Sequence, residues 1–201
     1  MSFPNSFVNN KAGIQLGSHH YSPVEESIRR RWHVPETLLR DVGLKSGMIF
    51  LDIGCGDGFF TVPAAEITGA EGRVFAVDAD ASAIGRLNGK VVEKGLTNVT
   101  SRVGTAEETV FCEGCADLVF YSIVLHDFGD PGKVLRKAKR MVKPSGKLVN
   151  LDWKKKTSEF GPPVRIRFSE SEAVSLIEAA GFRVESVTDS GQDHYIVTAK
   201  P

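Results

Sequence analysis

The stretch Phe50-Leu51-Asp52-Ile53-Gly54-Cys55-Gly56-Asp57-Gly58-Phe59-Phe60 runs from an apolar strand, through three alternate glycines, into a helix. Glycine permits positive φ and lets another group approach the backbone closely. In open α/β sheets, ligands bind outside the carboxyl ends of the strands, where such a turn lies. The stretch therefore predicts an α/β fold with a ligand directly over this turn.

The spacing of the glycines and the charge of the turn limit the class of ligand that can bind there. A dinucleotide fingerprint needs glycine or alanine where this chain has Phe59 or Thr61. Asp52 and Asp57 bracket the glycines, and their carboxylates would repel a phosphate diester. The turn thus favours a positively charged ligand without phosphate and disfavours a nicotinamide-dependent oxidoreductase.

A second acid follows at the end of the next apolar run. Asp78 lies 24 residues after Gly54, close to the separation at which an acid binds ribose hydroxyls. The alternative is that Asp78 only caps the helix that follows. Asp80 is better placed for the cap, which leaves Asp78 for a ligand.

Strands and helices alternate along the chain. Strands are predicted over residues 48–53, 73–77, 99–103, 117–121, 147–151, 182–188 and 194–199, and helices over residues 22–31, 59–67, 80–93, 131–142 and 170–180, with a short helix from Pro35 to Gly43. Helix-linked strands indicate a mostly parallel sheet covered on both faces. No helix separates the last two strands, so one of them is expected to run antiparallel.

Composition bounds the class of protein. The chain has 201 residues, with 25 basic and 25 acidic residues, which gives no sign of a nucleic-acid partner. It contains no apolar stretch long enough to span a membrane and no secretory leader, so a cytoplasmic protein is expected. We expect residues 1–33 to form an N-terminal arm and cap helix, and residues 34–201 to form one domain.

The three cysteines, Cys55, Cys112 and Cys115, are too few and odd in number for a disulfide framework. Cys112 and Cys115 have the spacing of a zinc-binding pair, but two further ligands at suitable spacing are missing. No metal is therefore expected, and a structural role is favoured for this pair.

Five segments together, in order, resemble the motifs of class I S-adenosylmethionine-dependent methyltransferases. They are residues 51–58, Val77-Asp78, the turn Gly104-Thr105-Ala106-Glu107, residues 117–126 and residues 143–148. The resemblance covers residues 34–201 and is closest to the ubiquinone/menaquinone-type and arsenite-type small-molecule enzymes. It implies a Rossmann-like fold whose seven strands lie in the order 3-2-1-4-5-7-6, with strand 7 antiparallel and helices on both faces.

The resemblance also implies S-adenosylmethionine as cofactor, converted to S-adenosylhomocysteine. The cofactor-binding positions it assigns are Asp52, Gly54, Cys55, Gly56, Gly58, Asp78, Ala79, Thr105, Ala106, Glu107, Tyr121 and Ser122. One departure is Thr105, since the family often has aspartate in this adenine-binding turn. Adenine recognition would then depend more on the backbone of Ala106.

The residues after the fourth strand are candidates for chemistry. His126 and Asp127 are interpreted either as a general base with its orienting acid or as a polar pair at a helix edge. Tyr21, His126 and Trp153 are candidates for binding the substrate. Trp153 either stacks on the substrate or packs beneath the loop of residues 161–163.

The favoured function is in-line methyl transfer to a small-molecule acceptor, in which alignment of the reacting atoms supplies much of the rate. The main alternative is a cofactor-binding protein without catalysis on the same fold, because binding motifs can be present without an acceptor site.

Overall fold

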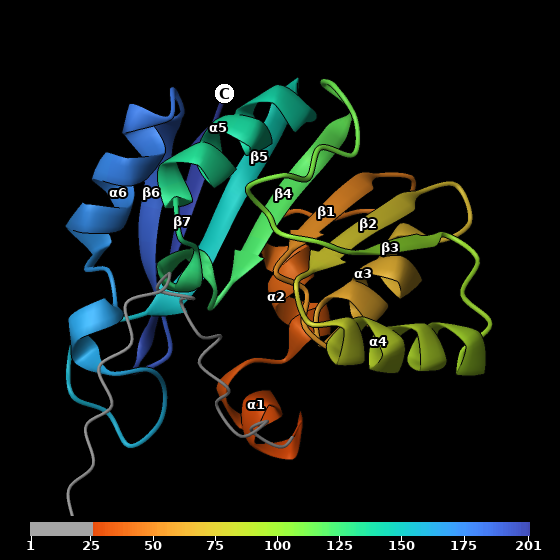
Figure 1. Ribbon diagram of the computed structural model, residues 1–201, viewed down its shortest axis with the longest axis horizontal. Coiled ribbons are helices and arrows are strands. Elements are labelled where there is room, and N and C mark those ends of the chain that lie inside the picture. Colours follow the sequence, from red (N-terminus) through yellow and green to blue (C-terminus); the bar gives the residue numbers. More distant parts are fainter. Residues whose placement is uncertain (1–25) are drawn as a thin grey trace, which may run out of the picture.

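The computed structural model describes residues 26–201, and it contains one seven-stranded sheet (Figure 1). Five neighbouring strands are parallel, in the order β3 (Val99–Val103), β2 (Arg73–Asp78), β1 (Ile49–Ile53), β4 (Ala116–Ser122) and β5 (Val142–Trp153). β7 (His194–Lys200) runs antiparallel between β5 and β6 (Arg183–Ser190). The predicted strand order and the antiparallel strand 7 are confirmed.

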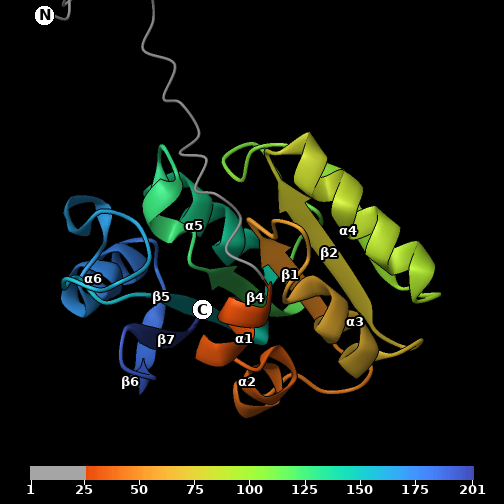
Figure 2. The ribbon, with the colours of Figure 1, turned by 90° about the horizontal axis from the view of Figure 1, so that it is seen from below.

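Helices cover both faces of the sheet, as expected. Figure 2 shows α5 (Pro131–Met141) and α6 (Glu170–Ala179) on one side, and α2 (Pro35–Asp41) and α3 (Thr61–Thr68) on the other. α4 (Ala81–Glu93) packs beside α3, and α1 (Glu26–Trp32) lies near the carboxyl end of the parallel strands.

The central strands are buried on both faces, which explains why β1 has no polar–apolar alternation. Phe50 points into the core beneath α3, whereas Leu51 points into the core beneath α5 and α6. On one face of β2 the covering element is the loop after β3 instead of a helix. There Phe111 of the loop packs on Phe75 of β2, with ring centroids 5.2 Å apart. The α4 helix begins as expected, since the Asp80 side chain accepts a hydrogen bond from the Ser82 N–H at 2.8 Å.

Several element boundaries differ from the sequence-based expectation, and two of these differences lie next to the predicted motifs. The helix after the glycine turn begins at Thr61 rather than at residue 59. Strand β5 begins at Val142, so that Pro144 and Gly146 lie within the strand instead of before it. The pairing register between β4 and β5 shifts there, and a Cβ on Gly146 would lie 2.7 Å from the carbonyl oxygen of Ala116. Gly146 thus allows a close backbone contact within β5, at a position where the sequence had predicted the end of the preceding helix.

The cysteine interpretation is corrected in one respect. Cys112 and Cys115 form a disulfide in the loop before β4, with their Cα atoms 5.9 Å apart. Sequence counting argued against a framework of several disulfides, and such counting carries no information on a single bridge between near neighbours. Cys55 is reduced and buried.

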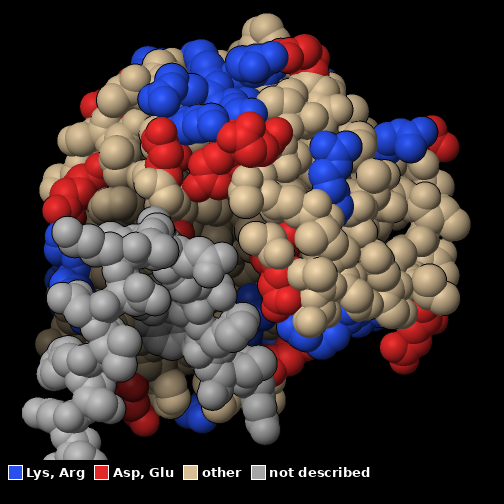
Figure 3. Space-filling model, in the orientation of Figure 1, with Lys and Arg blue, Asp and Glu red and all other residues tan. Residues whose placement is uncertain are grey.

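Two surface properties bear on partners. Within residues 26–201, no helix combines the length and apolarity needed to cross a bilayer. Figure 3 shows lysine and arginine side chains gathered on one part of the surface beside acidic ones. The α5 helix alone carries Lys133, Arg136, Lys137, Lys139 and Arg140, and two of these are paired with acids, Lys133 with Glu108 and Arg140 with Glu113.

The strand order places the chemistry-bearing turns together. The chain proceeds from β1 to β2 and β3 on one side, then crosses back to β4 on the other side of β1. The loops that follow β1 and β4 therefore leave the sheet side by side and in opposite directions. This reversal of strand order is where open α/β sheets form a ligand-binding crevice.

Candidate functional site

The glycine turn is fixed to the end of β2 by its own backbone. The N–H groups of Gly54 and Cys55 both donate to the carbonyl oxygen of Val77, at 2.8 and 3.0 Å. One oxygen of Asp78 accepts from the Gly56 N–H at 2.7 Å, and the other accepts from the Asp80 N–H at 2.9 Å. Asp78 therefore orders the turn in addition to any contact with a ligand.

The three glycines serve different purposes, although all have positive φ. A Cβ on Gly54 would lie 2.5 Å from Val124, and one on Gly58 would lie 2.5 Å from Leu87. Gly54 and Gly58 are thus needed for internal packing. A Cβ on Gly56 would have no neighbour within 4 Å among the described residues, because this glycine faces a pocket.

That pocket has a volume of about 940 Å³ and opens along the carboxyl edge of the parallel strands. It brings together six of the residues predicted for the cofactor, the chemistry or the substrate, namely Gly56, Asp78, Ser122, His126, Asp127 and Trp153. These residues come from four separate segments, so the fold assembles a site from dispersed motifs.

Other predicted cofactor positions do not line this pocket: Asp52, Gly54, Cys55, Gly58, Ala79, Thr105, Ala106, Glu107 and Tyr121. The Tyr121 side chain is fully buried in the core near Phe128, so only its backbone is available to a ligand. Glu107 accepts from the Gly129 and Asp130 N–H groups at 3.0 and 3.4 Å, which ties the turn after β3 to the start of α5. Tyr21 lies outside the described residues.

The pocket lining is mainly acidic. Its described walls contain five carboxylates, of Asp57, Asp78, Asp80, Asp127 and Glu159, and two guanidinium groups, of Arg29 and Arg86. Asp57 was expected to face a cationic ligand, but it pairs with Lys90 at 2.9 Å and Arg29 at 3.4 Å. The acids of the lining outnumber its guanidinium groups, so the pocket suits a cationic group better than a phosphate.

Asp52 lies buried beneath the turn. One carboxyl oxygen accepts from the Thr61 hydroxyl at 2.6 Å, and the other has no hydrogen-bond partner within the described part of the chain. Burial raises the pKa of Asp52 to about 7, partly offset by the bond from Thr61. An unpartnered buried acceptor below the turn and an open cradle at Gly56 above it both fit a ligand with ammonium and hydroxyl donors.

A second polar arrangement involves the segment after β4. The Nδ1 atom of His126 lies 2.8 Å from a carboxyl oxygen of Asp152, and both side chains are almost completely buried. The Nε2 atom lies 3.6 Å from Asp127, which is longer than a hydrogen bond. The carboxylate that orients the ring is therefore Asp152 from β5, a residue that the sequence reasoning missed.

Strained backbone precedes this histidine. Ile123 has φ of 57°, and no other non-glycine residue in 26–201 has a positive φ. A branched side chain in this region is a genuine outlier, and such strain is concentrated at functional sites. Its N–H donates to the carbonyl oxygen of Leu151 at 2.7 Å, so the strained turn is tied to the end of β5.

Aromatic side chains form the wall of the pocket opposite the glycine turn. The ring centroid of Trp32 lies 5.2 Å from that of Trp153 and 5.5 Å from that of Phe160. A Cβ on Gly161 would lie 2.6 Å from the Trp153 ring, so the tryptophan packs beneath the 161–163 loop and also lines the pocket. Arg167 orders this loop by donating to carbonyl oxygens that include those of Pro162 and Phe160, at 2.8 and 3.1 Å.

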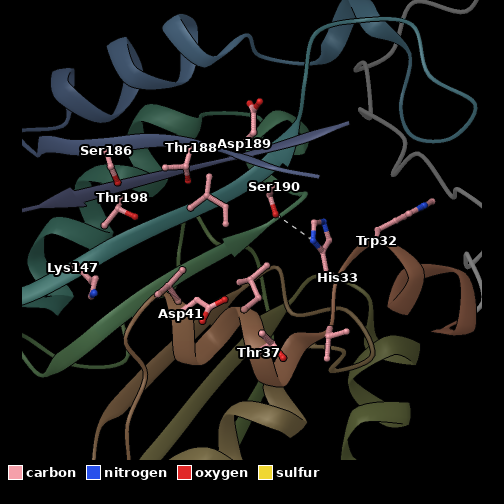
Figure 4. A pocket seen from close by; sticks show the side chains of 14 residues that line it. Trp32, His33, Thr37, Asp41, Lys147, Ser186, Thr188, Asp189, Ser190 and Thr198 are labelled. Carbon is pink, nitrogen blue, oxygen red and sulfur yellow. Dashed lines mark hydrogen bonds between the residues drawn. The ribbon is translucent and has the colours of Figure 1, made fainter. Parts of the chain in front are cut away.

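Trp32 also borders a second pocket, of about 670 Å³, between α2 and strands β5, β7 and β6 (Figure 4). Its strand side presents hydroxyl groups, those of Ser186, Thr188, Ser190 and Thr198. The His33 ring lies within 3.4 Å of the Ser190 hydroxyl. None of the residues predicted for cofactor or substrate lines this pocket, so the candidate active site is the first one.

Several lining residues had no signal in the sequence. Arg29, Trp32 and Phe160 belong to segments without a recognisable motif, and only the folded chain brings them to the pocket. Asp152 had a weak signal, because it is an acid near the end of a largely apolar run that ends a central strand. A buried acid at the carboxyl end of a strand is a reasonable candidate for a site residue.

Comparison with known proteins agrees with this geometry. A crystal structure of a SAM-dependent methyltransferase from Aquifex aeolicus has 30% sequence identity and a TM-score of 0.78, and the match covers 88% of this chain and 98% of that one. A demethylmenaquinone methyltransferase from Geobacillus sp. (strain WCH70) is 30% identical over 135 residues, which is 66% of this chain and 58% of that protein. Nocamycin O-methyltransferase from Saccharothrix syringae is 31% identical over 115 residues, 57% of this chain and 41% of that protein.

The chain thus spans less than two thirds of the length of these two curated relatives. A family model described as a methyltransferase domain matches residues 44–192. The comparisons support S-adenosylmethionine as the cofactor and give no support to an oxidoreductase. This chain belongs to the methyltransferase domain family.

Proposed function

We propose that this protein binds S-adenosylmethionine over Gly56 and catalyses methyl transfer to a small-molecule acceptor in the aromatic part of the same pocket. The observation that carries the proposal is the open cradle at Gly56, beside Asp78, at the reversal of strand order. When bound, the cofactor supplies a methyl group on a sulfonium. The carboxylates around the pocket match that positive charge.

Within this proposal, Asp78 accepts hydrogen bonds from the ribose hydroxyls, and Asp52 interacts with the ammonium group from below the turn. Ser122 lies at the end of β4, between the cofactor and the acceptor. The turn of Thr105, Ala106 and Glu107 follows β3, and the Gly104 N–H donates to the Asp78 carbonyl at 2.9 Å, which supports an adenine position next to the ribose.

The acceptor half of the pocket supports a flat, largely apolar substrate. Trp32 and Phe160 line it with aromatic rings, the buried Trp153 packs behind them, and His126 supplies a polar group. The relatives' names, a demethylmenaquinone methyltransferase and an O-methyltransferase, are consistent with such acceptors. We propose a cytoplasmic location, which the redox state of Cys112 and Cys115 in cells would test.

Calorimetry with S-adenosylmethionine and S-adenosylhomocysteine tests the cofactor assignment. We expect Asp78→Asn to weaken both affinities about 10- to 100-fold, because hydrogen bonds to a charged group contribute ~1.5–3 kcal/mol. Asp130→Asn is the matched control, since Asp130 also accepts a backbone N–H but does not line the pocket. Equal affinities for the wild type and Asp78→Asn would remove Asp78 from the site.

Asp78→Asn keeps the size of the side chain but replaces one of the two acceptor oxygens with a donating amide group, so one of the two bonds that order the turn is lost. A far-ultraviolet spectrum and a thermal unfolding curve of each variant check that the fold is retained. A screen of small hydroxylated and quinone-type acceptors, with methyl-labelled cofactor, then tests for turnover. Tight cofactor binding without turnover on any of them would favour the non-catalytic alternative.

A further inference from the structure

We propose that His126 accepts a proton from the methyl acceptor through Nε2, and that Asp152 is the positioning residue that holds its ring. The acceptors this implies are flat compounds whose reacting hydroxyl arrives protonated. The inference rests on the proposed methyl transfer and adds to it a named base and a class of acceptor.

The hydrogen-bond pattern determines which nitrogen is available. Asp152, as a carboxylate, only accepts hydrogen bonds, so the Nδ1 atom 2.8 Å away carries the proton. The other nitrogen, Nε2, then has an unshared electron pair. It cannot be satisfied by Asp127, whose oxygen lies 3.6 Å away and has no proton to give when ionised.

The backbone holds the two partners in register. Ser122, at the end of β4, pairs with Leu151 of β5, and Asp152 follows on β5. The Ile123 N–H donates to the Leu151 carbonyl, which turns the chain sharply into the short 3-10 helix Leu125–Asp127 that carries His126. The same Asp152 oxygen accepts from the Trp153 N–H at 2.8 Å, so its orientation is set before any substrate binds.

The pocket and the buried oxygen of Asp152 favour a functional role for the His126–Asp152 pair over a purely structural one. His126 lines the same pocket as Ser122 and Trp153, and its side chain is 1% exposed. The second oxygen of Asp152 is buried without a hydrogen-bond partner within residues 26–201, which is a costly placement if Asp152 served stability alone. The strain at Ile123 adds a further cost at the same place.

The proposed step balances. The proton passes from the acceptor hydroxyl to Nε2, and the oxygen electron pair left behind forms the new bond to the methyl carbon. The electron pair of the carbon–sulfur bond that breaks remains on sulfur. The positive charge is thereby transferred to the His126 imidazolium, which lies next to Asp152 and Asp127. The imidazolium later loses its proton to water.

The charged groups around the ring agree with this role. Burial lowers the pKa of His126, but the bond to Asp152 and the charges of Asp152 and Asp127 outweigh burial and the opposing charge of Arg167. The pKa of His126 therefore lies above its ordinary value. Because only the neutral ring accepts a proton, activity is expected to fall as the pH drops through this pKa.

The first test reads the histidine directly by nitrogen-15 nuclear magnetic resonance on the intact protein. The chain has five histidines, and His126→Gln assigns the signal. We expect the wild-type ring to carry its proton on Nδ1. In Asp152→Asn the preference for this tautomer is lost and the pKa falls by about one pH unit. In Asp127→Asn the tautomer stays and the pKa falls less. The reverse ranking of these two variants would overturn the assignment of Asp152.

The second test uses naphthols of increasing acidity as acceptors, the most acidic of them ionised at neutral pH. His126→Gln is expected to lower kcat about 100-fold or more for the weakly acidic naphthols, the usual range for a general base. The loss should disappear for the ionised member, which needs no base. Asp152→Asn should follow the same trend with little change in KM, and Asp130→Asn should behave as the wild type.

The outcomes separate the two proposals. An equal loss across the naphthol series would make His126 a structural residue and overturn the inference. A wild-type protein that binds S-adenosylmethionine but methylates none of the naphthols would overturn the acceptor class and leave the proposed function standing. Failure to bind S-adenosylmethionine would count against the proposed function itself. If Asp152→Asn does not fold, the tautomer measured in the wild type and the naphthol series with His126→Gln still test whether His126 is the base.

Discussion

At the scale of single residues, Gly56 differs from the other glycines of its turn. Gly54 and Gly58 would place a Cβ against Val124 and Leu87, whereas Gly56 faces open space. A side chain at Gly56 would therefore not disturb the core and would occupy the volume proposed for the cofactor.

We expect Gly56→Val to abolish binding of S-adenosylmethionine and S-adenosylhomocysteine while the protein still folds. Positive φ at this position costs a non-glycine residue ~1–2 kcal/mol of stability. Gly191→Val is the matched control, because Gly191 also has positive φ, also has no neighbour within 4 Å, and lies in the distant turn between β6 and β7. Both variants should lose similar stability in urea unfolding, and only Gly56→Val should lose affinity in calorimetry. Normal binding by folded Gly56→Val would refute the cradle.

The sequence pointed to pocket residues that lie in their own local turn, and it missed a contact that depends on a distant partner. Gly56 and Asp78, which line the pocket, could be singled out because glycine spacing and strand ends can be read along the chain. Asp152 was missed because its pairing with His126 depends on the register between β4 and β5, and a slip of one residue would turn Asp152 to the opposite face of the sheet. Asp127 was chosen as the orienting acid only because it is the next residue.

At the scale of elements, the segment after α1 is attached to strand β7 through two buried histidines. The ring centroids of His33 and His194 are 4.6 Å apart, and His194 also packs on Trp153 at 4.0 Å. Burial and the nearby charge of Arg29 lower the pKa of His33 to about 4. Burial and the neighbouring His33 lower the pKa of His194 to about 3. The contact is therefore made by neutral rings.

This pair predicts a loss of stability in acid. Both pKa values lie below the ordinary 6.5, so the unfolded chain binds protons first as the pH falls below 6.5, and the loss continues towards about 4. Asp52 acts in the opposite direction, since its folded pKa of about 7 favours the folded state as the pH falls below 7.

His194→Phe separates these contributions, because it keeps an aromatic ring and removes one titrating group. At about pH 5 the wild type should have lost up to ~2 kcal/mol more of its pH 7 unfolding free energy than the variant, at ~1.4 kcal/mol per pKa unit. Urea unfolding of both proteins at the two pH values measures this difference. Parallel pH profiles would show that His194 is not the source.

At the scale of the whole molecule, the pocket and the disulfide lie at opposite ends of the parallel strands. The pocket lies where the strands end, whereas the disulfide of Cys112 and Cys115 lies in the loop that precedes β4, at the edge where the strands begin. Strand order and sheet direction were predictable because hydrophobic runs, glycine stops and the final hairpin are local signals. The aromatic wall of Trp32 and Phe160 was not, since it forms only when α1 meets the loop between β5 and α6, two segments far apart in the sequence.

The double variant Cys112→Ser, Cys115→Ser tests this separation. We expect its affinity for S-adenosylhomocysteine to stay within about twofold of the wild type, as for distant independent sites. Its unfolding free energy should fall by about 2 kcal/mol, the scale for opening a very short covalent loop. Calorimetry and urea unfolding on one preparation give both values. A large drop in affinity would mean that the two edges are coupled.

Ile123 has a consequence for how the protein can change. Its left-handed backbone keeps the turn after β4 out of its preferred shape, and the hydrogen bond to Leu151 holds it there. Exchange for glycine would relieve that tension, but it would also remove the Ile123 side chain from the core that it packs against and give the unfolded chain more freedom. It would loosen the tether on His126 as well, so a relaxed backbone and precise placement of the proposed base oppose each other at this position.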